Sequence, residues 1–138
     1  MSDWPELPAA LALSALTERL QAAQGWENKN RLLVQLAREL PAMPTELKVD
    51  ENRVSGCEAH VWLLTRWHEG RLQMWADSDS RIVKGLLALV WAAYQGLSRE
   101  EIANQDFGAL LQELGLQRFL SSSRASGLNA MVQVIRNA

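Results

Sequence analysis

Cys57 is the only cysteine in the 138-residue sequence, and it is the residue best suited to covalent chemistry. It follows Gly56, whose backbone freedom favours a tight exposed turn, and it precedes a strand-like segment. A single cysteine excludes an intramolecular disulfide framework and an all-cysteine metal site. Three interpretations remain for Cys57: a buried apolar thiol, a reactive thiol, or a thiol that crosslinks to another chain.

The two histidines offer neither a clear activating base nor a metal site. His60 is three residues from Cys57, so in a regular strand the two side chains point to opposite faces. A Cys–His pair for acyl transfer therefore requires the loop to bend. His68 lies far from Cys57 along the chain. We expect no bound metal and no cofactor.

A β-hairpin is predicted to follow Cys57 directly. Residues 59–67 are rich in β-branched and aromatic side chains, and Glu69-Gly70 is typical of a hairpin turn. Residues 72–76 alternate as a second strand. Antiparallel pairing across the turn would place Cys57 roughly opposite the start of a helix that begins at Arg81.

The polar loop 77–80 and Arg81 are then expected at the same end of the sheet as the thiol. This loop offers Asp77 and Asp79, with Arg81 beside them, to the surface of a partner protein. The alternative interpretation of the loop is a solvated cap for the helix that follows.

Helices are predicted on both sides of the hairpin in the sequence. Apolar periodicity and capping residues indicate helices over residues 8–23, 26–39, 81–95 and 107–114, one after Ser98, and a last one from about Ser123. Residues 43–56 carry little periodicity and are predicted to be extended or loop. This order predicts an α+β fold, with a small antiparallel sheet packed against N-terminal and C-terminal helices. Residues 1–138 are expected to form one domain.

The charge balance and the apolar runs exclude several classes of partner. The net charge is -2, and no basic stripe is available to neutralise phosphates, so nucleic-acid binding is not expected. Acidic residues precede the apolar run from Leu7 to Leu16, unlike the positive start of a signal peptide. The run from Leu86 to Tyr94 is too short to cross a bilayer. We expect a cytoplasmic protein that does not bind membranes.

Four segments together resemble the SufE/CsdE family of sulfur-acceptor proteins. Any one of them is a weak signal, but all four, in this order and at this spacing, are specific. The resemblance covers nearly the whole chain from Trp26, and residues 40–44 and 113–116 look more like the CsdE branch. The segments are Trp26-Glu27 with Lys29, Leu36 and Leu40-Pro41; Gly56-Cys57-Glu58 with Val61-Trp62; Asp77-Ser78-Asp79 with Ile82-Val83-Lys84-Gly85-Leu86; and Ser123-Arg124 with Gly127-Leu128.

The resemblance implies a SufE/IscU-like fold and a role in sulfur transfer. In this family a pyridoxal-phosphate cysteine desulfurase makes a persulfide, and the acceptor takes its outer sulfur and stimulates the desulfurase. The acceptor then passes the sulfur to an iron–sulfur cluster scaffold or another sulfur acceptor. By match to the family, Cys57 is the persulfide carrier. The residues expected to bind the partner are Glu58, Asp77, Asp79, Arg81 and Arg124.

Two other functions stay open on the sequence alone. One is a module that regulates a desulfurase by docking without covalent transfer. The other is a thiol enzyme such as a peroxidase or hydrolase, which needs a base near Cys57. In the preferred interpretation the chain is a sulfur-transfer partner and not an independent enzyme. Its thiol is expected to be partly shielded in the free protein, because a waiting persulfide must be protected from oxidants and stray thiols.

Overall fold

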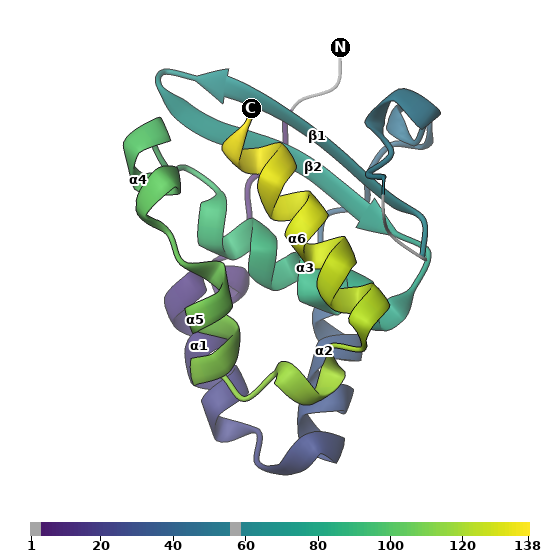
Figure 1. Cartoon of the computed structure of the whole chain (residues 1–138), viewed down its shortest axis with the longest axis vertical. Coiled ribbons are helices and arrows are strands. Elements are labelled where there is room, and N and C mark those ends of the chain that lie inside the picture. Colours follow the sequence, from purple (N-terminus) through teal and green to yellow (C-terminus); the bar gives the residue numbers. More distant parts are fainter. Residues whose placement is uncertain (1–3, 56–58) are drawn as a thin grey trace.

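The computed structural model describes residues 4–55 and 59–138. The described residues form six α-helices, short 3-10 helices and one two-stranded antiparallel sheet, which confirms the predicted α+β class (Figure 1). The main elements are α1 (Leu13–Ala22), α2 (Gly25–Glu39), β1 (Val61–His68), β2 (Arg71–Ser78), α3 (Arg81–Tyr94), α4 (Arg99–Asn104), α5 (Phe107–Glu113) and α6 (Ser122–Arg136).

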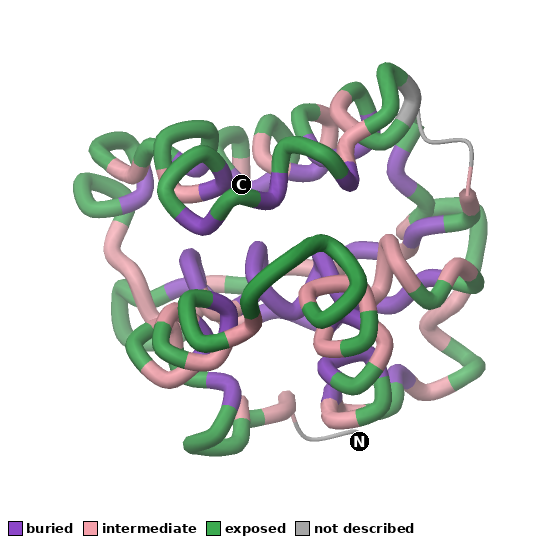
Figure 2. Tube along the Cα trace, turned by 90° about the horizontal axis from the view of Figure 1, so that it is seen from below, coloured by how far each residue is buried: buried purple, intermediate pink, exposed green. Residues whose placement is uncertain are grey.

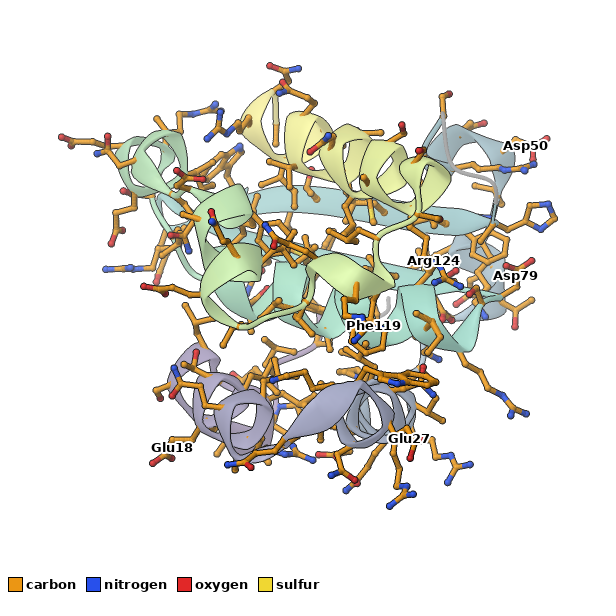
Figure 3. All side chains as sticks on the ribbon, turned by 60° about the horizontal axis from the view of Figure 1, so that its bottom comes forward. Glu18, Glu27, Asp50, Asp79, Phe119 and Arg124 are labelled. Carbon is orange, nitrogen blue, oxygen red and sulfur yellow. The ribbon has the colours of Figure 1, made fainter. Side chains whose placement is uncertain are left out.

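Helix α3 is the centre of the packing. It contacts β2 and α6 on one side and α1 and α2 on the other (Figures 1 and 3). Nine of its residues are buried, including Trp91 and Tyr94. Buried positions gather between the layers, and exposed positions lie on the outer turns of the surrounding helices (Figure 2). Among the described residues, none of the helices has both the length and the apolar character needed to span a bilayer.

The hairpin has the predicted two-residue turn. His68 pairs with Arg71, and Glu69 and Gly70 between them have φ values of 53° and 75°. Two consecutive residues with positive φ define the turn whose twist matches that of paired strands. The register runs from this turn to the pair Val61–Ser78 at the other end of the sheet.

Three predictions of secondary structure were wrong in detail. The first predicted helix is divided, because Ala12 is extended between a 3-10 turn (Ala9–Leu11) and α1. Residues 43–56 contain two short 3-10 helices, Thr45–Leu47 and Asp50–Asn52. The predicted loop 77–80 begins later, because Asp77 and Ser78 continue β2 as partners of Trp62 and Val61.

Helices α2 and α3 approach each other most closely at Gly85. A Cβ atom at this position would overlap the carbonyl oxygen of Leu33 and would lie 2.8 Å from its carbonyl carbon. Both atoms belong to the backbone of α2, so they cannot move aside as a side chain could. Gly85 therefore sets the distance between the central helix and the α1–α2 layer.

We predict that Gly85→Ala destabilises the protein by about 1–3 kcal/mol, because the added methyl group forces the two helices apart. Urea unfolding followed by circular dichroism measures this change. Gly108→Ala in α5 is the matched control, since a Cβ there meets only the Asp106 side chain at 3.5 Å. The control should stabilise by roughly 0.5–1 kcal/mol through its helix preference. Equal stability of the Gly85→Ala variant and the original chain would contradict this account of α2–α3 packing.

Candidate functional site

The chain on either side of the Cys57 segment is fixed to one end of the hairpin. The N–H of Val54 donates to the carbonyl of Val61 at 2.9 Å, and Arg53 forms an isolated antiparallel bridge with Trp62. The predicted nucleophile Cys57 and its neighbour Glu58 lie outside the described residues, as does the expected shielding of the thiol. These contacts hold the two ends of the segment that contains Cys57 side by side.

Asp77 lies inside this end of the molecule and pairs with two lysines. Its side chain is 5% exposed, and its oxygens lie 2.8 Å from Nζ of Lys48 and 3.1 Å from Nζ of Lys84. The backbone N–H of Ser78 also donates to Asp77 at 2.8 Å. Asp77 thus joins β2 to the segment before Cys57, through Lys48, and to the first turn of α3, through Lys84.

The environment of Asp77 favours its charged form. Burial alone would raise the pKa of this carboxyl group, but the hydrogen bonds from Lys48, Lys84 and the Ser78 backbone outweigh burial and lower it. Both lysines keep contact with solvent, which reduces the cost of placing three charges together.

His60 and Asp79 extend the pairing of the strands one step beyond the sheet. The backbone N–H of Asp79 donates to the carbonyl of His60 at 3.2 Å, and the N–H of His60 donates to Oδ1 of Asp79 at 3.1 Å. The two side chains also meet, with Nδ1 of His60 3.1 Å from Oδ2 of Asp79. Both side chains are about half exposed, so this contact lies on the surface and buries neither group.

The first turns of α3 and α6 lie at the same end of the molecule (Figure 1). Arg81 belongs to the first turn of α3, and Arg124, labelled in Figure 3, belongs to the first turn of α6. Both are exposed, and neither has an ion-pair partner among the described residues. Arg124 is oriented by a hydrogen bond from Nη1 to the carbonyl of Phe119 at 3.1 Å. Two guanidinium groups and the positive ends of two helices make this surface attractive to anionic groups.

The structure therefore brings most of the predicted site residues to one end of the fold. Asp79, Arg81 and Arg124 are exposed there, as a docking surface requires. Asp77 is 3% exposed and faces inward, so the expectation that it offers its carboxylate to a partner is corrected to a role in holding the site together. Lys48 was missed by the sequence reasoning, because no pattern in the sequence links it to Asp77.

Over residues 4–55 and 59–138, His, Cys, Asp and Glu side chains do not gather in groups of three or more that could hold an ion. His60, the histidine nearest Cys57 in sequence, is engaged with Asp79.

Comparisons with known proteins define the class of the chain. The model of the SufE family, described as an Fe-S metabolism associated domain, matches residues 14–138, and the chain belongs to this family. A solved structure, the solution structure of a hypothetical protein from Thermus thermophilus, is similar to it with a TM-score of 0.71. That similarity covers 91% of this chain and 90% of the other at 20% identity, so it bears on the fold alone.

Within the family, the chain is similar to the sulfur acceptor protein CsdE of Escherichia coli (strain K12). The two are 44% identical over 111 residues, which cover 80% of this chain and 76% of CsdE. The resemblance to the SufE/CsdE family, with features of the CsdE branch, is thereby confirmed.

We predict that Asp77→Asn lowers the free energy of unfolding at neutral pH by roughly 1–3 kcal/mol, because the two lysines lose a buried charged acceptor. The folded-state pKa of Asp77 lies below its ordinary value of 3.8. Its stabilisation is therefore fully present above pH 3.8 and is lost as the pH falls through the lower folded-state value. Urea unfolding at several pH values should show the difference between the two proteins shrinking in acid.

Asp50→Asn serves as the control for this measurement, since Asp50 is exposed and has no ion pair among the described residues. Its effect should be within about 0.5 kcal/mol at every pH. An Asp77→Asn variant as stable as the Asp50→Asn variant at neutral pH would rule out a structural role for the lysine pairs.

Proposed function

We propose that this protein is a sulfur acceptor that takes persulfide sulfur from a pyridoxal-phosphate cysteine desulfurase onto Cys57. It stimulates the desulfurase and passes the sulfur on to iron–sulfur cluster assembly or another sulfur acceptor in the cytoplasm. The observation that carries this proposal is one cysteine in a SufE-family chain, in the segment attached to the exposed charged end of the fold. The name of the similar protein CsdE, a sulfur acceptor, supports it.

The proposed transfer follows the chemistry of thiol–disulfide exchange. The Cys57 thiolate attacks the outer sulfur of the desulfurase persulfide, and a new S–S bond forms as the old one breaks. The electron pair of the broken bond leaves on the desulfurase cysteine, which becomes a thiolate. Delivery repeats the exchange, with an acceptor thiolate attacking the outer sulfur on Cys57. Neither step needs a metal ion or a second cysteine in this chain.

The described residues support this function by preparing the surface around the thiol segment. Arg81 and Arg124 supply exposed positive charge, which favours a thiolate over a thiol when it lies close by. Together with Asp79 they form the described part of the proposed docking surface for the desulfurase. Glu58, which lies outside the described residues, is also proposed to bind this partner. Asp77 acts from inside by fixing Lys48 and Lys84.

We predict that Cys57→Ser abolishes sulfur uptake and leaves the fold unchanged, because a serine hydroxyl does not replace the thiolate as the nucleophile. Mass spectrometry after incubation with the desulfurase and cysteine is the measurement. The original chain should gain one sulfur on the peptide that contains Cys57, and the variant should gain none. Uptake of labelled sulfur by the variant would refute the proposal.

The same variant distinguishes the second candidate, a module that regulates the desulfurase by docking alone. The exposed charges of Asp79, Arg81 and Arg124 would serve that function without any thiol chemistry. Full stimulation of the desulfurase by Cys57→Ser would favour regulation, whereas loss of stimulation together with loss of uptake supports transfer.

We predict that the double variant Arg81→Gln/Arg124→Gln keeps sulfur uptake at saturating concentration but needs roughly tenfold more protein for half-maximal stimulation. The loss corresponds to removing one strong interface contact. Its stimulation should also depend less on salt than that of the original chain. Arg31→Gln/Arg38→Gln on α2 is the matched control, because it removes two exposed arginines outside the proposed surface. Equal effects of the control and the double variant would show that only net charge matters.

A further inference from the structure

A second candidate site lies at the turn end of the hairpin, away from the Cys57 segment. It is a cavity of about 340 Å³ where the end of β1 meets α4 and the last turn of α6. These elements lie together at the tip of the hairpin in Figure 1. The cavity is lined by Trp67, Arg99, Ile102, Ala103, Ile135 and Arg136. Its volume falls at the lower end of the range of about 300–1,000 Å³ for small-molecule sites.

The polar groups that line this cavity are donors. The guanidinium of Arg99 lies 4.4 Å from the ring centroid of Trp67 and donates to the backbone oxygen of Ala138 at 2.6 Å. Arg136 donates to the carbonyl of Gln105 at 3.0 Å. Each guanidinium carries five N–H groups, so most of them are not used by these two hydrogen bonds. Within the part of the chain that the structure describes, neither arginine forms an ion pair with an acidic side chain.

One buried polar atom of a lining residue, the indole Nε1 of Trp67, lacks a hydrogen-bond partner among the described residues. A buried donor without an acceptor is rare in folded proteins. Burial raises the pKa of the Tyr94 phenol, whereas the charge of Arg136 and a hydrogen bond from it lower that pKa.

We propose that this cavity binds a small molecule through an oxyanion, either a phosphate or a carboxylate group. An oxyanion carries only acceptors, which complement a lining that offers two guanidinium groups. Stacking on Trp67 holds the Arg99 guanidinium in place before the ligand arrives. The apolar side chains of Ile102 and Ile135 fit a short apolar part of the same molecule. This site goes beyond the proposed sulfur-acceptor function and shares no residue with it.

Titration with inorganic phosphate and, separately, with butyrate tests the proposal, with ¹H–¹⁵N spectra of the indole N–H groups as the readout. The Trp67→Phe variant identifies the Trp67 signal among the six tryptophans. We expect a saturable shift of that signal with at least one of the two anions, and the tighter anion identifies the group that the site prefers. Arg99→Gln and Arg136→Gln should each weaken binding about tenfold or more.

Sodium chloride at matched ionic strength and the Arg31→Gln variant are the controls. Arg31 is exposed on α2 and takes no part in the cavity. Unchanged spectra elsewhere in each variant show that it remains folded. A Trp67 signal that ignores both anions, that moves equally with chloride, or that responds equally in Arg31→Gln and Arg99→Gln would overturn the proposal. Sulfur uptake by Arg99→Gln should equal that of the original chain, so failure here is distinct from failure of the sulfur-acceptor function.

Discussion

The pairing of the buried Asp77 carboxylate with Lys48 and Lys84 is the interaction on which the site depends. A buried carboxylate is costly unless its charge is compensated, so the fold is constrained to keep both lysines within reach. One lysine precedes the Cys57 segment and the other begins the central helix. The same interaction therefore joins the end of β2 and the first turn of α3 to Lys48, which lies 29 residues before Asp77 in the sequence.

Helix α3 connects this charged cluster to the rest of the core. Lys84 and Gly85 are neighbours in sequence, and successive residues of an α-helix point about 100° apart. Lys84 therefore reaches the hairpin while Gly85 contacts Leu33 of α2. These two adjacent residues therefore contact two different layers. The ion pair of Lys84 with Asp77 holds α3 to the sheet, and the absence of a Cβ at Gly85 lets α2 approach from the other side. These contacts give a physical reason for the residues Lys84 and Gly85, which sequence analysis named only as part of the resemblance to the family.

Local chemistry made the hairpin and the helix caps predictable. Glu69-Gly70 forms the expected turn, and the helix expected after Ser98 begins with a capping box formed by Ser98 and Glu101. The environment of Asp77 was not predictable in this way, because an Asp-Ser-Asp run has the composition of a solvated loop. The residue that decides its burial, Lys48, lies outside any local pattern. Cys57 as the nucleophile rests on cysteine count and family resemblance, and its geometry lies outside the described residues.

Asp77 and Asp79 are the same residue type, but their positions give them different environments. Both would face the same side of a continuous strand, since they are two residues apart. The sheet ends at Ser78, however, so Asp77 is covered by its strand partner and the lysines while Asp79 stands at the surface beside His60. A sulfur carrier needs both: a fixed base from which the thiol segment extends, and an adjacent charged surface that another protein can recognise. The end of β2 separates these two requirements by two residues.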